Sequence, residues 1–352
     1  MEKIKIIVVD DSAIVRESFK EILANTSQYE LIATFSNPLP ALQFLENNNV
    51  DVIVTDIEMP NMDGLTFIKK VKEKKSIPFV VCSSYVDKFS ENYFSALKLG
   101  AVEIIAKPKI ANKAFYEESK TLILDAIKAA SIAKTKKFNF NIEIQPKLSA
   151  DVILEKPTTN TNVIKTDKII VIGSSTGGTD ALEYIFTHLK PNVPGIVVTQ
   201  HMPENFTFSF AKRLNSLSKL EIKEAENDDI VKRGKVFIAK GNKHLLIKRN
   251  NTTYFLEIKD GPLVSRHRPS VDVLFRSAAR AAAQNCIGIL LTGMGDDGAQ
   301  GLLELKNSGA FTIAQDENSC VVFGMPREAI RLNAHCKIYN LDEIIYFLNS
   351  LA

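Results

Sequence analysis

A serine flanked by small residues follows an apolar run in the middle of the chain. Residues 169–172 are β-branched, and Gly173-Ser174-Ser175-Thr176-Gly177 comes directly after them. This pentapeptide fits the G-x-S-x-G pattern of a nucleophile elbow, in which small neighbours permit a tight strand-to-helix turn that exposes the central hydroxyl. Ser175 is therefore the candidate nucleophile. Backbone N–H groups and the positive end of a helix face such a turn, so the stretch also predicts a site for negative charge.

Two other interpretations of this turn stay open. A phosphate-binding Walker loop requires Gly-Lys-Ser/Thr, whereas this chain has Gly177-Gly178-Thr179 without the lysine. A dinucleotide fingerprint requires a second glycine where Ser175 stands, and the next strand ends in Gln200 instead of a ribose-binding carboxylate. The pattern favours a nucleophile, with an anion cradle or a plain tight turn as the alternatives.

A serine nucleophile requires a base, and His201 is the predicted one. It directly follows the apolar run 195–199 and Gln200, at the carboxyl end of a strand expected beside the strand of Ser175. The other four histidines are less suitable. One lies far along the helix after the serine, one lies between two arginines that would lower the proton affinity of its ring, and two lie in polar segments where a surface position is expected. They are, in that order, His188, His267, and the pair His244 and His335.

Two adjacent carboxylates are candidates for the group that orients this histidine. A catalytic histidine needs an acceptor on its second ring nitrogen, which fixes the tautomer and stabilises the imidazolium. The apolar run 286–291 predicts a third buried strand, and the glycine-rich turn after it contains Asp296 and Asp297. We expect one of them to be the orienting acid. An aspartate that merely caps the next helix is an equally good explanation of this stretch alone.

A second group of reactive side chains stands near the start of the chain, at the ends of four apolar runs. Asp10 and Asp11 follow the first run, Asp56 the third, Ser83 the fourth and Lys107 the fifth. Because the carboxyl ends of parallel strands meet at one edge of a sheet, these side chains should converge. Three carboxylates beside one lysine repel one another unless a cation neutralises them, and such a hard oxygen site suits Mg²⁺.

Alternating strand-like and helix-like segments position these residues. In residues 1–130, strand-like runs at 4–9, 31–35, 50–55, 78–82 and 102–105 alternate with helix-period segments at 13–24, 38–47, 64–74, 89–98 and 112–131. This alternation predicts an α/β domain with a five-stranded, doubly wound parallel sheet.

The periodicity fades after the first domain and then returns. Residues 131–166 are rich in Lys, Asn, Thr and Pro, which predicts a flexible linker. In residues 167–352, apolar runs recur at 168–172, 195–199, 235–239, 286–291 and 310–314. They predict a second doubly wound α/β domain with a mostly parallel sheet.

The composition is that of a globular chain with two ordinary domains. Its 352 residues are 45% hydrophobic and 24% charged, which excludes a disordered or fibrous protein. A net charge of +3, from 44 basic and 41 acidic residues, gives no indication of nucleic-acid binding. The four cysteines have no metal or redox spacing, and no apolar stretch approaches the ~20 residues that span a bilayer. We expect a cytoplasmic protein with no nucleic-acid partner and no membrane insertion.

Residues 1–125 resemble response-regulator receiver domains. The resemblance rests on Asp10-Asp11, on Val-Thr-Asp-Ile-Glu-Met-Pro-Asn-Met-Asp-Gly around Asp56, and on Lys107-Pro108. It implies a phosphoryl group transferred from a histidine kinase, and a Mg²⁺ ion needed for that transfer. The residues it assigns are Asp56 as phosphoryl acceptor, Asp10, Asp11 and Asp56 as metal ligands, and Lys107 and Ser83 as the groups that close on the phosphoryl oxygens.

Residues 167–335 closely resemble the chemotaxis protein-glutamate methylesterases. Five segments carry the resemblance: Ile-Gly-Ser-Ser-Thr-Gly-Gly-Thr, Gln-His-Met-Pro-Glu-Asn-Phe-Thr, Arg-Pro-Ser-Val-Asp-Val-Leu-Phe, Leu-Thr-Gly-Met-Gly-Asp-Asp-Gly and Val-Val-Phe-Gly-Met-Pro-Arg-Glu-Ala. The family implies a phosphorylation-regulated serine hydrolase that demethylates glutamate methyl esters on the cytoplasmic domains of methyl-accepting chemoreceptors. Deamidation of receptor glutamines is the closely related activity.

The family motif assigns roles to individual positions of this chain. Ser175 matches the nucleophile, His201 the base and Asp297 the orienting acid, while Asp296 occupies the variable position. The backbone N–H of Met294 and a contribution from Thr176 would form the oxyanion hole, and no cofactor is implied for the catalytic domain. Whether the loop Arg266-His267-Arg268 meets acidic receptor helices or only solvent stays open at this point.

Overall fold

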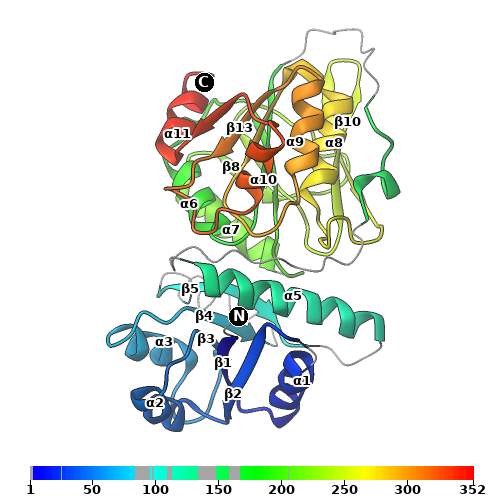
Figure 1. Cartoon of the computed structure of the whole chain (residues 1–352). Coiled ribbons are helices and arrows are strands. Elements are labelled where there is room, and N and C mark those ends of the chain that lie inside the picture. Colours follow the sequence, from blue (N-terminus) through cyan, green and yellow to red (C-terminus); the bar gives the residue numbers. More distant parts are fainter. Residues whose placement is uncertain are drawn as a thin grey trace. The chain divides into compact units, whose positions relative to one another are not determined.

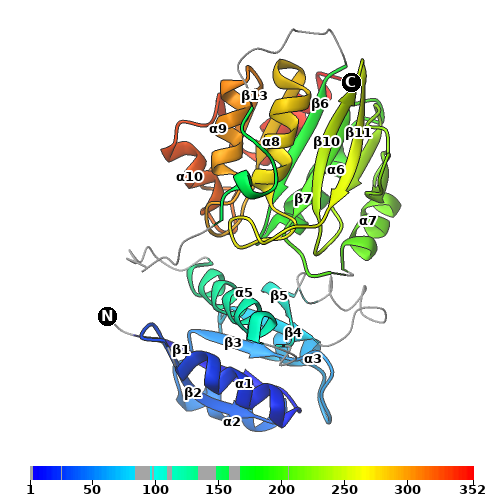
Figure 2. The same cartoon turned by 90° about the vertical axis from the view of Figure 1, so that its right-hand side faces the viewer.

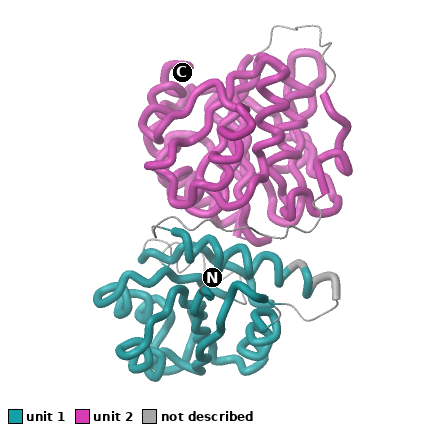
Figure 3. The backbone as a smooth tube through the Cα atoms, viewed as in Figure 1, with its two compact units in different colours: residues 1–139 teal, residues 140–352 magenta. Residues whose placement is uncertain are grey.

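The chain folds into two compact units, seen here in a computed structural model (Figure 1). The structure describes residues 3–24, 26–83, 96, 99–108, 113–133, 148–157, 167–204 and 206–352. The units comprise residues 1–139 and 140–352 (Figure 3), and each is treated by itself. Over these described ranges, no helix combines the length and the apolar character needed to cross a bilayer.

A five-stranded parallel sheet forms the centre of the first unit, as predicted. The strands pair in the order β2-β1-β3-β4-β5. The apolar side chains of β1 that fix this sheet pack against helices, with Ile6 and Val8 in one cluster with Phe19 of α1 and Ile127 of α5. The helix predicted at 89–98 lies, except for Ala96, outside the described residues. The elements are β1 (Ile4–Val9), α1 (Ala13–Ala24), β2 (Tyr29–Phe35), α2 (Pro38–Asn47), β3 (Val52–Thr55), α3 (Gly64–Lys72), β4 (Phe79–Ser83), β5 (Ala101–Ala106) and α5 (Lys113–Ile132).

A seven-stranded parallel sheet forms the centre of the second unit, which confirms the predicted mostly parallel α/β fold. Its order is β14-β13-β12-β6-β7-β9-β8, so β6 lies between β7 and β12. The strands are β6 (Ile169–Ser174), β7 (Gly195–Gln200), β8 (Glu221–Glu224), β9 (Lys235–Ile238), β12 (Cys286–Leu290), β13 (Phe311–Gln315) and β14 (Lys337–Tyr339). The helices are α6 (Gly178–His188), α7 (Phe206–Leu217), α8 (Val271–Ala281), α9 (Ala299–Asn307), α10 (Met325–Arg331) and α11 (Leu341–Asn349).

Four strands of this unit were not predicted. The edge strands β8 and β14 are short and partly polar, so they lack the apolar runs by which buried strands are found. The other two, β10 (His244–Asn250) and β11 (Thr253–Lys259), form a separate antiparallel hairpin (Figure 2). Its apolar residues pack on α8: Leu245, Ile247, Tyr254 and Leu256 belong to the same buried cluster as Leu274.

The predicted flexible linker over residues 131–166 is wrong for residues 148–157. Residues 150–152 form a short 3₁₀ turn, and Ile153 is buried with Leu246, Val264 and Val273. The Nη1 group of Arg276, in α8, donates to Asp151 Oδ1 at 2.6 Å and to the Leu154 carbonyl at 3.0 Å. Two buried side chains, Ala150 and Ile153, anchor the segment together with polar contacts from α8, β11 and the turn at Ser265. Two buried residues are too few to produce a periodic pattern in the sequence.

This anchored segment should stabilise the catalytic unit. A fragment of residues 167–352 exposes the surface that Ile153 covers and leaves the buried Arg276 without two of its acceptors. Burial of one such aliphatic side chain contributes about 1.5–3 kcal/mol, so we expect a melting temperature lower by roughly 3–10 °C than that of a fragment of residues 140–352. Differential scanning calorimetry of the two fragments tests this. Equal melting temperatures would mean that the segment adds no stability.

Candidate active site

The strand-to-helix turn after β6 holds Ser175 half-buried at the carboxyl edge of the sheet. The turn closes at Gly177, whose φ of 78° lies in the left-handed region that glycine adopts without strain. The Ser175 N–H donates to the Thr292 carbonyl, beyond the end of β12, at 3.0 Å. A Cβ atom on Gly293 would lie 2.7 Å from the Ser175 Cβ, so a glycine is required where the two turns meet.

Gln200 joins the backbone of Ser175 to that of His201. Its Nε2 group donates to the carbonyls of both residues at 2.9 Å, and its Oε1 accepts from Ser174 Oγ at 2.6 Å. The His201 N–H also donates to the Ser174 carbonyl at 3.0 Å. These four bonds fix the candidate nucleophile relative to the candidate base. Sequence reasoning missed this role of Gln200, although a buried polar residue ending an apolar strand was the available signal.

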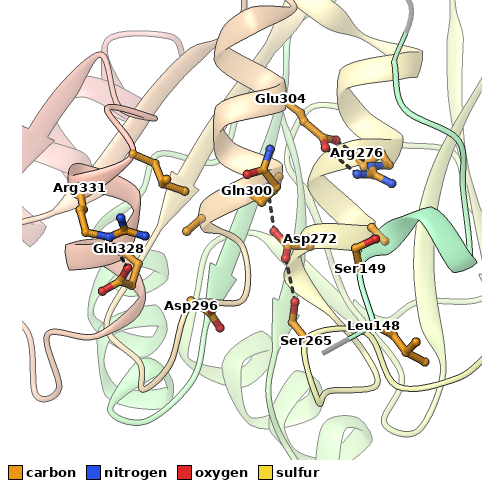
Figure 4. Close-up of a pocket in the computed structure, with 14 residues that line it drawn as sticks. Leu148, Ser149, Ser265, Asp272, Arg276, Asp296, Gln300, Glu304, Glu328 and Arg331 are labelled. Atoms are coloured by element: carbon orange, nitrogen blue, oxygen red, sulfur yellow. Dashed lines mark hydrogen bonds and ion pairs between the residues drawn. The ribbon is translucent and has the colours of Figure 1, made fainter. Parts of the chain in front are cut away.

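The His201 imidazole is oriented by Asp297. Nε2 lies 2.8 Å from Asp297 Oδ2, and the buried Nδ1 has no hydrogen-bond partner within the described part of the chain. Although burial opposes ionisation, the hydrogen bond from His201 and its charge hold the pKa of Asp297 below the ordinary value of 3.8. An ionised Asp297 fixes the proton on Nε2 and leaves Nδ1 as the basic nitrogen. Asp296, the other candidate, lines a separate cavity of about 310 Å³ (Figure 4).

Asp297 is held by the first turn of α8 as well as by His201. Its Oδ2 accepts from the Val271 N–H at 2.7 Å, and its Oδ1 accepts from Ser270 Oγ at 2.8 Å and from the Asp272 N–H at 3.0 Å. Three donors at a helix N-terminus stabilise a buried carboxylate that would otherwise lose its hydration. The aspartate therefore meets His201, as expected of the orienting acid, and it caps α8 instead of the helix that follows it in the chain, α9.

His267 lies in the same site, where the sequence analysis did not place it. Its ring stacks on that of His201, with centroids 3.7 Å apart and an interplanar angle of 11°. A tight turn presents it, since the N–H of Val264 donates to the His267 carbonyl and the N–H of His267 donates to the Val264 carbonyl. The neighbouring Arg268 donates to Asn242 Oδ1 and to the Gly261 carbonyl.

The expected surface position of His244 is wrong. Its side chain is fully buried, with Nε2 at 2.9 Å from the Pro262 carbonyl, and its Nδ1 accepts from the Ser270 N–H at 3.3 Å. Burial lowers the pKa of His244, which keeps the ring neutral and Nδ1 able to accept. The segment looked polar because Gly241-Asn242-Lys243 precedes His244 and Lys248-Arg249-Asn250 ends the strand, and only the packing of the hairpin on α8 buries its first residue.

Of the two residues expected at the oxyanion hole, Thr176 directly follows Ser175 and Met294 lies in the turn after β12. Thr176 is buried, and its carbonyl accepts from Thr292 Oγ1 at 2.9 Å. Met294 follows Gly293, the position at which an added Cβ would lie 2.7 Å from the Ser175 Cβ. The bond from the Ser175 N–H to the Thr292 carbonyl joins the two turns, and the oxyanion role of Thr176 and Met294 stays a prediction.

The acidic residues of the first unit converge as predicted. Asp10, Asp11 and Asp56 each offer a carboxylate oxygen within 4.8 Å of the others. Lys107 Nζ lies 2.9 Å from Asp10 Oδ2 and 2.7 Å from Asp56 Oδ2. The backbone N–H of Lys107 donates to the carbonyl of the buried Ser83. Burial raises the pKa of Asp10, against the effect of Lys107. Three carboxylates face one ammonium group here, and such a set of hard oxygen donors fits a divalent cation.

Comparison with known proteins agrees with both sites. Residues 170–348 match the family described as CheB methylesterase, and residues 6–115 match the response regulator receiver domain. The chain is 51% identical over 346 residues to protein-glutamate methylesterase/protein-glutamine glutaminase 3 of Geobacter metallireducens, and the match covers 98% of each chain. It is 50% identical over 346 residues to the protein of the same name from Shewanella oneidensis, and that match covers 97% of each chain. The crystal structure of the Thermotoga maritima CheB methylesterase catalytic domain matches 53% of this chain and 100% of its own, with 40% identity and a TM-score of 0.51. The chain therefore belongs to the CheB methylesterase family and carries a response regulator receiver domain ahead of the methylesterase domain.

Proposed function

We propose that the second unit hydrolyses methyl esters of glutamate side chains on chemoreceptors, with Ser175, His201 and Asp297 as the catalytic triad. The contact between His201 Nε2 and Asp297 Oδ2 at 2.8 Å carries this proposal, because it leaves Nδ1 as the only basic ring nitrogen. The bonds of Gln200 to both neighbouring carbonyls support the pairing of Ser175 with His201.

Hydrolysis proceeds through an acyl-enzyme. His201 Nδ1 takes the Ser175 Oγ proton as Oγ attacks the ester carbonyl, and the imidazolium returns that proton to the methoxide, which leaves as methanol. A water molecule, deprotonated in turn by His201, then cleaves the acyl-enzyme and releases a glutamate carboxylate. The ionised Asp297 stabilises each imidazolium. The backbone N–H of Met294 and a donor from Thr176 stabilise the oxyanion of both tetrahedral intermediates.

The substrates are methylated glutamates on the cytoplasmic domains of methyl-accepting chemoreceptors, and the enzyme works in the cytoplasm. Deamidation of receptor glutamines uses the same acyl-enzyme and releases ammonia in place of methanol. The double name of the curated relatives supports both reactions. Measuring methanol and ammonia from receptor-containing membranes tests the proposal, and release of neither product would contradict it.

We also propose that phosphorylation of Asp56 by a chemotaxis histidine kinase regulates this activity. The carboxylate of Asp56 attacks the phosphorus of the kinase's phosphohistidine, the P–N bond breaks and the kinase histidine leaves. The Lys107 ammonium and the Ser83 hydroxyl then bind the phosphoryl oxygens. Mg²⁺ would be held by Asp10, Asp11 and Asp56, and when bound it neutralises charge on the transferred group. The 4.8 Å cluster of carboxylate oxygens supports this ligand set.

Asp56→Asn should abolish the response to a phosphodonor. Without a nucleophilic carboxylate at position 56 no acyl phosphate forms, so the methanol-release rate should be the same with and without an acyl-phosphate donor. The wild-type rate should change by roughly 5- to 150-fold, the usual range of coupling between sites. Asp51→Asn, at an exposed aspartate of the same unit, is the matched control and should keep the full response. A donor response in Asp56→Asn would refute the assignment.

A further inference from the structure

Asp272 is a buried carboxylate that the proposed chemistry does not use. It lies in the first turn of α8, within the segment Arg-Pro-Ser-Val-Asp-Val-Leu-Phe, and is 7% exposed. Its Oδ1 accepts from the N–H of Gly298 at 3.0 Å and of Gly301 at 2.7 Å, and its Oδ2 accepts from Ser265 Oγ at 3.0 Å. Figure 4 shows Asp272 between Ser265 and the start of α9.

The carboxylates of Asp272 and Asp297 cap each other's helices. Asp297 accepts from the first N–H groups of α8, while Asp272 accepts from those of α9, which begins directly after Gly298. Neither helix is capped by the side chain of its own N-cap residue, Ser270 or Gly298. A carboxylate is the side chain that the positive end of a helix stabilises best. Because Asp297 directly precedes Gly298, the hydrogen bond from the Gly298 N–H to the Asp272 carboxylate also holds the backbone of Asp297 in position.

The other oxygen of Asp272 holds the turn that presents His267. That turn contains Ser265 at φ 49° and Arg266 at φ 71°, two left-handed residues without the freedom of glycine. Such a backbone conformation is strained for a residue with a side chain, and it persists only where the surroundings impose it. The Ser265 side chain is fixed by Asp272 and its N–H donates to the Leu148 carbonyl at 2.9 Å. Release of Ser265 would let the turn relax and withdraw His267 from the His201 ring.

Placing the carboxylate of Asp272 beside that of Asp297 in the interior is electrostatically unfavourable, so a contribution to stability does not by itself explain it. Burial, and the nearby charge of Asp297, raise the pKa of Asp272 well above 3.8. Two neighbouring buried carboxylates repel each other, and each needs several donors to remain in the interior. Two of the donors to Asp272 stand beside the neighbours of His201: Gly298 directly follows Asp297, and Ser265 lies in the turn of His267.

We propose that Asp272 is a positioning residue that fixes both neighbours of the His201 ring, Asp297 at Nε2 and His267 on the ring face. The proposal rests on the proposed function of the triad and deepens it. Asp272 acts only through these neighbours, so its loss should change the turnover of bound ester and leave ester binding intact.

Four variants of the full chain separate positioning from general support of the fold. Asp272→Ala removes all three hydrogen bonds and should lower kcat about 10²-fold with little change in KM, the effect of misplacing a catalytic group by about 1 Å. Asp272→Asn keeps an acceptor for Gly298 and Gly301 and a donor for Ser265 Oγ, so it should restore most of kcat. Ser265→Ala keeps both carboxylates, and with them the helix caps, and should lower kcat by a smaller factor.

The matched structural control is Glu304→Gln. Glu304 of α9 pairs with the buried Arg276 of α8 at 2.6 Å, so this variant weakens the same helix pair without touching Asp297. It should lower the melting temperature and keep kcat. If Glu304→Gln lowers kcat as much as Asp272→Ala does, or if Asp272→Ala and Ser265→Ala both keep wild-type kcat, the positioning role is refuted.

A second readout does not depend on substrate. The His201 Nε2 proton, shared with Asp297, should give a downfield proton resonance that disappears in Asp297→Asn. We expect this resonance to shift or broaden in Asp272→Ala and to return in Asp272→Asn. An unchanged resonance in Asp272→Ala overturns the proposal even if the wild-type enzyme releases no methanol, whereas absence of methanol from the wild type alone would contradict only the proposed function.

Discussion

Ser175→Ala should lower the rate of methanol release by roughly 10³- to 10⁶-fold, as loss of a triad nucleophile does. Without Oγ no acyl-enzyme forms, and the oxyanion donors and bound water can supply only residual catalysis. The fold should persist, because the substitution removes one oxygen from a half-buried turn whose backbone bond to Thr292 remains. Steady-state methanol release and the melting temperature are the two measurements.

The nucleophile can also be identified without a receptor substrate. A fluorophosphonate probe should label the wild-type chain at Ser175 and leave Ser175→Ala unlabelled, as judged by mass spectrometry of the digested protein. Ser216→Ala, at an exposed position of α7, is the matched control and should keep both labelling and turnover. Turnover of Ser175→Ala near the wild-type rate would show that another residue attacks the ester.

Asp297→Asn should lower kcat about 10⁴-fold, the loss that follows when a catalytic histidine is held in the wrong tautomer. An amide N–H at the present Oδ2 position would donate to Nε2 and place the imidazole proton on Nδ1, where it blocks transfer from Ser175. In that orientation the Val271 N–H loses its acceptor. The alternative orientation of the amide turns an N–H toward the backbone N–H of Asp272, which then loses its acceptor. Either orientation leaves a buried donor unpaired, so the free energy of unfolding should also fall by about 1–3 kcal/mol.

The neighbouring aspartate provides the control for this prediction. Asp296→Asn makes the same chemical change one residue earlier, on a side chain that lines the separate cavity. We expect it to keep the wild-type kcat and melting temperature. If Asp296→Asn proved the more damaging substitution, the choice of Asp297 as the orienting acid would be wrong. Both variants are compared by steady-state kinetics and by thermal unfolding in the same buffer.

The sequence by itself determined the two α/β units and the positions of their reactive strand ends. Buried parallel strands must be apolar on both faces, so β6, β7 and β12 appear as apolar runs, and the polar residues that end or follow each run are conspicuous. Because the carboxyl ends of parallel strands share one edge, Ser175 and His201 could be paired before any coordinates were known, and so could Asp10, Asp56 and Lys107.

Only the tertiary structure decided which groups surround His201. The family resemblance assigned the orienting role to Asp297, but the local residue pattern left Asp296 and Asp297 open, because the direction of the turn between β12 and α9 determines which of them meets Nε2. His267 reaches the His201 ring through the turn at 264–267, and the hairpin β10–β11 brings His244 to the Ser270 N–H at the start of α8. The segment 148–157 docks through the buried Ala150 and Ile153 and through polar contacts. A local pattern records periodicity and turn chemistry, whereas these contacts join residues far apart in the chain whose meeting is fixed by the packing of α8 and α9.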